Sequence, residues 1–414
     1  MRIALGGETD VVKILMLTRG LPYPLDTGAH IHDFHLLREL AREAEVVLCS
    51  LVRIDREVPE ALRRMCKEVV VLRPNPRRAR EIIGAAWRGW RAGRPLALSQ
   101  PYFDELAVRM RATIERHRVD IVQIEHSVLA GYFAGIPADR SILKVLSFHN
   151  LGWIQAARDL ELRREAGHRA FALFNALAMR GWEPRYAEHF DRCLVVSDSD
   201  ASLLRAKNSR LRISVIENGV DCERLQFLPE APENSAEILF VGLLGYPPNA
   251  DAVLFFCEEI LPLIRRSVPE ATFAVVGREA PPAIRRLAAR GQLTLVDGAP
   301  DPLPYYARAR VSAVPLRAGS GTRLKILESM ALGRAVVTTS IGCEGLAVND
   351  GTHLMIADSP NDFAGRVVRV LREPALRTEL IRNARELVEH RYDWKMIGDK
   401  LLKLYREMLA ERAT

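Results

Sequence analysis

The sequence is poor in cysteine and has no paired cysteine motif. Its six cysteines are scattered along 414 residues, and no two of them form a CxxC pair. This spacing argues against a zinc ribbon, a CxxC redox site or the dense disulfide framework of a small secreted domain. We expect reduced, mostly buried thiols, as in a cytoplasmic protein.

Long apolar runs are also missing. Residues 1–10 lack the apolar core and the cleavage site of a signal peptide. No uncharged apolar stretch is long enough to cross a bilayer. We therefore expect a cytoplasmic protein, attached at most peripherally to the inner face of a membrane.

The excess of positive charge is small. Lysine and arginine number 59 against 52 acidic residues, which gives a net charge of +7. Such a balance favours anionic partners, among them phosphate groups, nucleic acid and membrane surfaces. The sequence has no helix-turn-helix, zinc-finger or base-stacking motif, so no nucleic-acid partner is expected.

Short β-branched runs alternate with longer amphipathic stretches through most of the chain. Examples are the strand candidates Val12–Leu17 and Ile121–Ile124 and the helical stretches Ile154–Phe190 and Asp251–Arg266. Apolar runs without strict alternation, separated by helices, are typical of a parallel sheet covered on both faces. The fold class predicted is α/β, with doubly wound sheets.

The length of the chain predicts two domains. Residues 223–236 are rich in glutamate, contain two prolines and have little periodicity, so they are predicted to be a linker. The N-terminal Rossmann-like domain then covers residues 12–222, completed by a C-terminal helix over 394–414. The second covers residues 237–393. Ligands of such sheets bind outside the carboxyl ends of the strands.

The segment Gly319–Glu328 carries the most specific pattern. A strand is predicted to end at Pro315, two glycines (Gly319 and Gly321) open a turn around Ser320, and a helix begins near Thr322. Glycines let backbone N–H groups approach a ligand, and the start of a helix favours an anion. The alternative is an ordinary strand–turn–helix connection with solvated basic side chains.

Two cations stand at the expected start of that helix. Arg323 and Lys325 would oppose the helix dipole there, which makes sense if an anion such as a diphosphate binds. Glu328 lies further along and can accept two hydrogen bonds from vicinal hydroxyls such as those of a ribose.

The run GSGTRLKILESMALGRAVV resembles the donor-binding signature of GT-B fold glycosyltransferases, in particular family 4 of the glycosyl transferases group 1 superfamily. An ordered series of further matches covers most of the chain, from about Lys13 to Tyr405. Its members are LPYPLDTG at 21–28, SFHN at 147–150, ENGVD at 217–221 and FVGLLGYPPNAD at 240–251.

The resemblance implies two Rossmann-like domains facing each other across a cleft, and a role for each matching residue. Glu328 would hold the donor ribose, while Arg323 and Lys325 would neutralise the diphosphate. His149 would contact the transferred sugar near its anomeric centre, and Gly28 would let the N-terminal loop approach the donor or the acceptor. The remaining donor-binding residues expected are Gly242, Gly319, Ser320, Gly321 and Thr322.

The same resemblance implies the reaction. A sugar would pass from a nucleotide-diphosphate donor to a glycan or lipid-linked acceptor, with retention of anomeric configuration, as in bacterial polysaccharide biosynthesis. No cofactor and no metal are expected.

Two departures from the family pattern keep alternatives open. Ser320 stands where a glutamate is usual, and Leu243 and Pro248 replace a frequent arginine and lysine. Arg323 and Lys325 would then take over the phosphate contacts. The alternatives are a nucleotide-sugar epimerase or hydrolase of the same fold, and a non-catalytic subunit that binds nucleotide sugars.

Other polar clusters have plainer interpretations. Asp198 and Asp200 mimic a DxD metal motif, but a serine before a helix with acids in its first turn favours helix capping. His30, His32 and His35 lack the spacing of a metal site, so they are interpreted as helix and loop histidines, with acceptor contact as a secondary role for His32 or His35.

A membrane contact is suggested by residues 82–98. This stretch mixes tryptophans and arginines at roughly helical spacing, as on a surface that lies on an anionic membrane or faces the acceptor. The alternative is a helix with buried tryptophans and solvated arginines.

Overall fold

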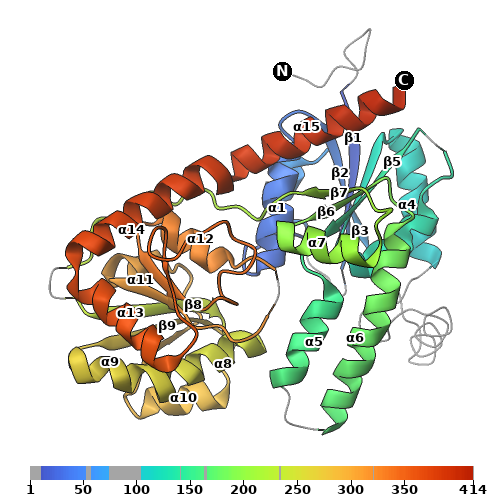
Figure 1. The fold of residues 1–414 in the computed structure, drawn as a ribbon. Helices are drawn as coiled ribbons and strands as arrows, with labels where there is room; N and C mark the ends of the chain where they lie inside the picture. Colours follow the sequence, from blue (N-terminus) through green and yellow to red (C-terminus); the bar gives the residue numbers. More distant parts are fainter. Residues whose placement is uncertain are drawn as a thin grey trace. The chain divides into compact units, whose positions relative to one another are not determined.

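The computed structural model describes residues 11–52, 57–73, 104–139, 141–162, 166–232, 235–319 and 321–413. The chain forms two compact units, and Figure 1 labels their helices and strands along the ribbon. The N-terminal unit runs to Glu217 and includes the chain from Ile397 onward. The C-terminal unit is Asn218–Met396. The stretch 82–98 lies outside the described residues.

A seven-stranded parallel sheet forms the centre of the N-terminal unit as described. Its spatial order is β3-β2-β1-β4-β5-β6-β7. Ile14 of β1, for example, pairs with Val46 of β2 and Ile121 of β4. The strands are β1 (Lys13–Thr18), β2 (Glu45–Leu51), β3 (Glu68–Leu72), β4 (Ile121–Glu125), β5 (Leu143–Phe148), β6 (Arg192–Val195) and β7 (Ile213–Val215).

The central strands are buried along almost their whole length because helices cover both faces of the sheet. Every residue of β4 is buried, including its two polar side chains, Gln123 and Glu125. Buried polar groups need hydrogen-bond or ionic partners. We therefore expect polar interactions of Gln123 and Glu125 inside this part of the N-terminal unit.

The helices of this unit are the connections between its strands. The predicted stretch Ile154–Phe190 is in fact two helices, α5 and α6, which pack against each other. The described helices are α1 (Gly28–Leu40), α2 (Glu60–Met65), α4 (Asp104–His117), the 3₁₀ helix η1 (Ser127–Gly135), α5 (Gly152–Leu162), α6 (Ala166–Ala187) and α7 (Asp198–Lys207).

The C-terminal unit repeats the plan with a six-stranded parallel sheet within its described residues. The order is β10-β9-β8-β11-β12-β13. The strands are β8 (Glu237–Leu243), β9 (Thr272–Arg278), β10 (Thr294–Asp297), β11 (Val311–Val314), β12 (Ala335–Thr338) and β13 (Met355–Ile356). The doubly wound α/β architecture is thereby confirmed in both units.

The described helices of this unit cover the sheet and differ from the prediction in one detail. The expected helix Asp251–Arg266 is two helices joined by a π turn. The elements are α8 (Pro247–Phe255), η2 (Phe256–Ile260), α9 (Leu261–Ser267), α10 (Pro282–Ala289), α11 (Leu303–Arg308), α12 (Leu324–Ala331), α13 (Pro360–Arg372), α14 (Pro374–Leu387) and η3 (Val388–Tyr392).

Each sheet has a point where the strand order reverses. In the N-terminal unit this point lies between β1 and β4, and in the C-terminal unit between β8 and β11. Crevices at the carboxyl ends of such strand pairs are where doubly wound sheets bind ligands. The loops that follow these four strands are therefore the places to look for a site.

The last helix, α15 (Trp394–Ala413), belongs to the N-terminal unit from Ile397 onward. Gly398 lies so close to α1 that an added Cβ would be 2.4 Å from the Cβ of Glu39. Further along, the Tyr405 hydroxyl donates to Gln123 Oε1 at 2.6 Å. The helix is thus fixed to the N-terminal sheet by close packing and by a buried hydrogen bond.

The boundary between the units falls at Glu217 rather than at the predicted residue 222. Val220 forms an isolated β-bridge with Asp393, so this stretch is held within the C-terminal unit. The strand β8 then begins at Glu237, where the predicted linker was expected to end. Of the helices that the structure describes, none is long and apolar enough to cross a membrane.

Candidate functional site

The glycine turn predicted from the sequence follows β11 at the strand-order reversal of the C-terminal unit. Gly319 and Gly321 have φ angles of 114° and 74°, which side chains with a Cβ rarely adopt. The helix α12 begins at Leu324, two residues later than expected, and Arg323 is its N-cap residue rather than part of the first turn. A Cβ at Gly319 would lie 2.9 Å from the Arg323 guanidinium.

Lys325 is held at the end of the neighbouring strand β8. Its Nζ donates to Asn249 Oδ1 at 2.8 Å and lies 4.0 Å from the centre of the Phe240 ring. Gly242 leaves room for this ammonium, since a Cβ there would lie 2.7 Å from Nζ. The Asn249 amide is itself fixed by donating to the Leu243 carbonyl at 2.8 Å.

The electrostatics of this turn depend on burial and on like charge. Burial, helped by the nearby Arg323 guanidinium, lowers the pKa of Lys325 to about 7 against the opposing effect of Glu328. Burial raises the pKa of Glu328 above its usual value, against the pull of Lys325 and Arg224. A dianionic ligand beside Lys325 would relieve the first effect by favouring the ammonium form.

Glu328 lies one turn after Lys325 on α12. Within the described part of the chain, no side chain makes a hydrogen bond to its carboxylate, which leaves both oxygens to accept from a ligand. Thr322 is buried and its hydroxyl contacts the Asn218 amide, which connects the turn to the first residues of the unit. Ser320 is outside the described residues.

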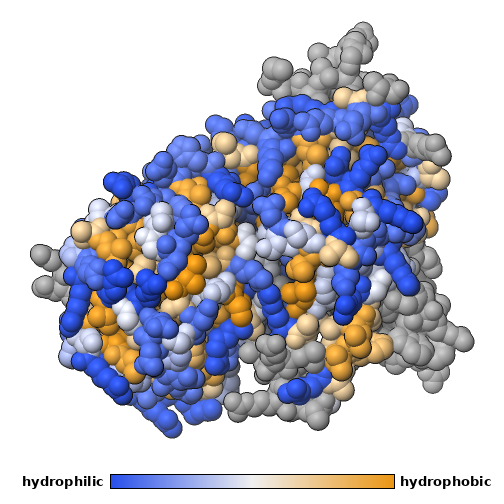
Figure 2. Space-filling model, viewed as in Figure 1, coloured by the Kyte–Doolittle hydropathy of each residue, from blue (hydrophilic) through white to orange (hydrophobic). Residues whose placement is uncertain are grey.

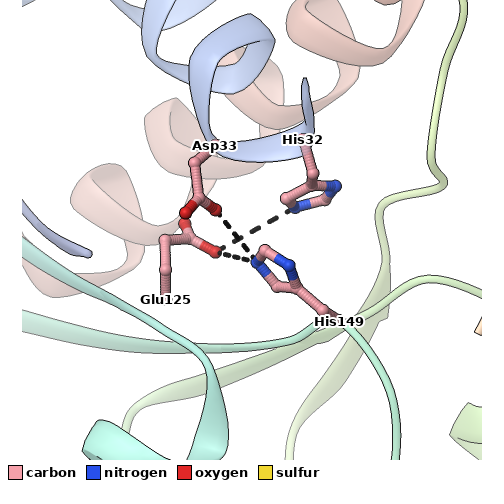
Figure 3. Close-up of side chains that lie close together, drawn as sticks. All are labelled: His32, Asp33, Glu125 and His149. Carbon is pink, nitrogen blue, oxygen red and sulfur yellow. Dashed lines mark hydrogen bonds and ion pairs between the residues drawn. The ribbon is translucent and has the colours of Figure 1, made fainter. Parts of the chain in front are cut away.

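In the N-terminal unit the predicted residues flank the strand-order reversal. Gly28 is the first residue of α1, directly after the cap residue Thr27, whose hydroxyl accepts from the His30 N–H at 3.2 Å. His149 directly follows β5. Its side chain is part of a cluster with His32, Asp33 and Glu125, shown in Figure 3.

Three segments of the chain contribute to this His–carboxylate cluster, which comprises His32, Asp33, Glu125 and His149. His32 and Asp33 are on α1, and Glu125 is the last residue of β4. His149 Nε2 lies 2.9 Å from Glu125 Oε2 and 3.1 Å from Asp33 Oδ1. His32 Nε2 is 4.0 Å from the same Glu125 oxygen.

A fifth side chain, His126, borders the cluster. Its ring centre is 3.7 Å from that of His149, and its Nε2 is 3.8 Å from Asp33 Oδ2. Burial lowers the pKa of His126, and the positive charge of His149 lowers it further. Burial alone would also lower the pKa of His149, but Asp33 and Glu125 raise it to about 9. Burial alone would raise the pKa of Asp33, yet His149 and His126 bring it below its usual range.

Asp33, Glu125 and His126 were not singled out from the sequence. A signal was available for Glu125 and His126, because they end a buried strand at the position where doubly wound folds present ligand contacts. The interpretation of His32 as an ordinary helix histidine needs correction, since its imidazole faces buried carboxylates. His30 does fit that interpretation: it pairs with Asp26 at 2.7 Å near the surface.

The predicted cap at Asp198 and Asp200 is confirmed. Ser197 is the N-cap residue of α7, and its hydroxyl oxygen accepts from the Asp200 N–H at 3.1 Å. Both acids lie in the first turn, where they complement the helix dipole.

Comparison with known families agrees with this geometry. Residues 27–224 match the Glycosyltransferase Family 4 profile, and residues 235–373 match that of the Glycosyl transferases group 1 family. The chain belongs to the family 4 glycosyltransferases. This enzyme matches the two families in order, with one match in each of its α/β units.

Relatives of the glycosyltransferase align over different shares of its length. An uncharacterized 44.6 kDa protein in the cps region of Klebsiella pneumoniae is 20% identical over 95% of this chain and 100% of its own. The D-inositol 3-phosphate glycosyltransferase of Acidothermus cellulolyticus is 33% identical, over only 44% of this chain and 43% of its own.

Solved structures share the GT-B fold. Sucrose-phosphate synthase from Thermosynechococcus elongatus superposes with a TM-score of 0.73 at 17% identity, covering 97% of this chain and 100% of that one. Anabaena HepE in complex with UDP-glucose superposes with a TM-score of 0.64 at 15% identity, covering 95% and 100%. These structures confirm the predicted fold, and the two family matches confirm the predicted transferase class.

Proposed function

We propose that this glycosyltransferase takes its sugar from a nucleotide-diphosphate donor bound at the glycine turn of the C-terminal unit. The observation that carries the proposal is the grouping of Arg323, Lys325 and Glu328 at the carboxyl end of β11. Two cations suit a diphosphate, and a carboxylate without a hydrogen-bond partner among the described residues suits the hydroxyls of a ribose. The complex of Anabaena HepE with UDP-glucose supports the same class of donor.

In this proposal the departing diphosphate is stabilised by groups already in place. Arg323, Lys325 and the N–H groups of the glycine turn supply the positive potential that a metal ion supplies in other transferases. Asn249 accepts a hydrogen bond from Lys325, and the missing side chain at Gly242 leaves room for its amine. Little reorganisation is therefore needed when negative charge develops on the departing diphosphate. The transfer itself then needs no metal and no cofactor.

The remaining roles follow the family resemblance. We propose that His149 contacts the transferred sugar, that Gly28 lets the backbone approach the donor or acceptor, and that anomeric configuration is retained. A glycan or lipid-linked saccharide is the proposed acceptor, and a role in polysaccharide biosynthesis fits the relative from the cps region. Analysis of the product anomer by NMR tests the retention.

The first test is the variant Glu328→Gln, which keeps the shape of the side chain and removes its charge. We expect donor affinity to fall by about tenfold to a hundredfold, because a charged hydrogen-bond acceptor contributes about 1.5–3 kcal/mol. Calorimetric titration with a panel of uridine and guanosine diphosphate sugars measures the affinity.

The matched control is Glu344→Gln in the same unit, a carboxylate outside the turn. We expect the control to bind donors as the wild type does. Undiminished donor affinity in a folded Glu328→Gln variant would contradict the ribose assignment.

A peripheral membrane contact is the second part of the proposal, and it now rests on α6. Leu173, Phe174 and Leu177 are 50%, 41% and 60% exposed, at spacings that place them on one helical face. Figure 2, drawn in the view of Figure 1, shows apolar surface over this helix. Arg169 and Arg180 extend the stripe at both ends, at spacings of four and three residues.

The charge of the stripe selects the kind of membrane. The single acid of α6, Glu183, is buried, and the side chains described on the exposed face of the helix are apolar or basic. Such a face fits an anionic bilayer. The proposed partner of this face of α6 is therefore a lipid bilayer rather than a second protein.

Co-sedimentation with vesicles tests this contact. We expect binding to phosphatidylglycerol vesicles, little binding to phosphatidylcholine vesicles, and at least a tenfold loss with Leu173→Ser combined with Leu177→Ser. The control Val108→Ser replaces an exposed apolar residue of α4, 65% exposed, and should bind like the wild type. Equal losses in both variants, or a stable dimer dispersed only by the α6 variant, would contradict the lipid assignment.

A further inference from the structure

The His–carboxylate cluster of the N-terminal unit has the composition and compactness of a metal site. One ligand atom from each of His32, Asp33, Glu125 and His149 lies within 4.8 Å of the other three. Figure 3 shows the four side chains pointing toward one another from α1, from the end of β4 and from the residue after β5. All four side chains are at least nine-tenths buried.

The charges of the cluster call for a cation. Two carboxylate oxygens converge on one nitrogen, His149 Nε2, which has a single proton to donate. Among the described residues, no lysine or arginine forms an ion pair with either carboxylate. A charged His149 balances one of the two buried carboxylates, and an uncompensated second charge is costly away from water. The groups that could balance it are a second protonated imidazole, since His126 lies 3.8 Å from Asp33 and His32 lies 4.0 Å from Glu125, or a metal cation. One divalent cation would balance both.

The donor set indicates which cation. Two imidazole nitrogens with two carboxylate oxygens suit Zn²⁺ and similar transition metals, whereas Mg²⁺ and Ca²⁺ prefer oxygen ligands alone. With bonds of about 2.0–2.1 Å, the ligands of a tetrahedral zinc site lie about 3.3 Å apart. Three of the six separations are 2.9, 3.1 and 4.0 Å, which lie on both sides of that value, and none of the six exceeds 4.8 Å.

The surroundings hold one ligand in place, as the outer contacts of metal sites do. Gln123 donates its amide hydrogen to Glu125 Oε1, which leaves Oε2 directed into the cluster. The Tyr405 hydroxyl of α15 in turn fixes Gln123 at 2.6 Å. The orientation of the Glu125 carboxylate therefore depends on contacts between two elements, β4 and α15, rather than on one mobile side chain.

We propose that the N-terminal unit binds one Zn²⁺ ion through His32, Asp33, Glu125 and His149. The ligands are spread over more than a hundred positions of the chain, which is why no local spacing motif announces them. The proposal is independent of the donor chemistry assigned to Arg323 and Lys325. With the ion bound, His149 is a ligand, so excess zinc should slow the transfer if His149 has its proposed role.

The test measures binding rather than turnover. Full-length protein treated with chelator is titrated with Zn²⁺ by calorimetry in a large excess of Mg²⁺, and Co²⁺ is added separately as a spectroscopic probe. We expect one Zn²⁺ per chain, and the strong visible absorption that tetrahedral Co²⁺ gives. The combined variant Asp33→Asn, Glu125→Gln should lose at least about 100-fold in zinc affinity.

A surface site provides the matched control. His117 Nε2 lies 2.7 Å from Glu68 Oε2 near Arg116, so adventitious zinc has a histidine and a carboxylate there as well. The variant His117→Ala should bind zinc as the wild type does. Zinc should raise the melting temperature of wild type and control but leave that of the double variant unchanged.

Three results would overturn the proposal. They are undiminished affinity in the folded double variant, loss of affinity in His117→Ala, and the weak spectrum of octahedral Co²⁺ in the wild type. If the double variant does not fold, His32→Gln with the Co²⁺ spectrum decides the question, because it removes one nitrogen ligand and keeps both carboxylates.

Discussion

Lys325 experiences two opposing influences whose balance changes when an anion binds. In the free enzyme, burial and Arg323 hold its pKa at about 7, so at pH 8 the amine is about nine-tenths neutral. A bound diphosphate favours the ammonium form and raises the pKa. We therefore expect binding of UDP at pH 8 to take up nearly one proton, and binding at pH 5.5 to take up almost none.

Calorimetry in two buffers of different ionisation enthalpy measures this uptake. The variant Lys325→Met should bind more weakly and should lose the proton uptake at pH 8. Arg323→Met should weaken binding but keep proton uptake at pH 8. The guanidinium of Arg323 is charged at both pH values and takes up no proton itself, and Lys325 is still present in this variant. Equal uptake by wild type and Lys325→Met would assign the proton to another group.

Among individual residues, the sequence predicted the site residues that lie close together in the chain. Gly319, Arg323 and Glu328 fall within one strand–turn–helix, so their proximity follows from local spacing. The partners of Lys325 do not: Asn249 and Gly242 come from another strand and its following helix. The same holds for Asp33 and Glu125, which only the topology of the sheet brings beside His149.

At the scale of elements, the packing of α15 against α1 depends on a single small residue, Gly398. Gly398 packs directly against α1, so an added Cβ would lie 2.4 Å from the Cβ of the buried Glu39. Neither backbone can move without disturbing the ion pairs of Glu39 with Arg38 and Arg42. We expect Gly398→Ala to destabilise the N-terminal unit by about 1–3 kcal/mol, as overpacking does.

Urea unfolding of the full chain measures the change. The control is Gly181→Ala, a helix glycine of α6 in the same unit with no atom within 4 Å of an added Cβ. It should leave stability unchanged or raise it by up to about 1 kcal/mol, because alanine is the better helix former. Equal effects of the two substitutions would show that α15 does not pack as described.

The elements also show where periodicity misleads. The stretch Asp251–Arg266 has one continuous helical pattern, yet a π turn at Phe256–Ile260 divides it before Pro262. Proline has no N–H to donate, and its ring crowds the preceding turn of the helix. The α-helical hydrogen-bond pattern is therefore replaced by the wider π turn just before Pro262. Apolar spacing of three and four residues is nearly the same on both sides of such a turn, and so it does not reveal the break.

For the whole molecule, the alternation of strands and helices was enough to predict two doubly wound sheets. The boundary was less accessible, because Val220 is kept in the C-terminal unit by its bridge to Asp393, far away in the sequence. The composition of residues 223–236 indicates an irregular segment between regular elements, but it does not predict the bridge between Val220 and Asp393. Long-range pairing of this kind sets which unit a segment joins.

Because the two units have separate cores, a pH effect confined to one of them should appear in one unfolding transition alone. Glu183 belongs to the N-terminal unit, where it accepts hydrogen bonds from the Ser127 hydroxyl and, at 3.2 Å, from the Gly152 N–H. Burial raises its pKa to about 7, although these donors favour the carboxylate. The folded state therefore holds this proton between pH 4.5 and 7, where the unfolded chain releases it.

The sign of the effect follows from that difference in proton binding. Where the folded state binds more protons, the free energy of unfolding falls as pH rises. The contribution of Glu183 is complete below pH 4.5 and is lost by about pH 7, a change of about 3 kcal/mol. Glu183→Gln keeps the acceptor oxygen and stays neutral, so it should flatten this dependence for the N-terminal transition.

Urea unfolding at pH 5 and pH 7 compares the variant with Glu105→Gln, an exposed carboxylate of α4 in the same unit. The control should keep the wild-type dependence, and the C-terminal transition should be unaffected by either substitution. A wild-type slope in folded Glu183→Gln would mean that the carboxyl group is ionised in its buried position at pH 5. The hydrogen bonds from Ser127 and Gly152 would then favour the carboxylate by more than burial disfavours it.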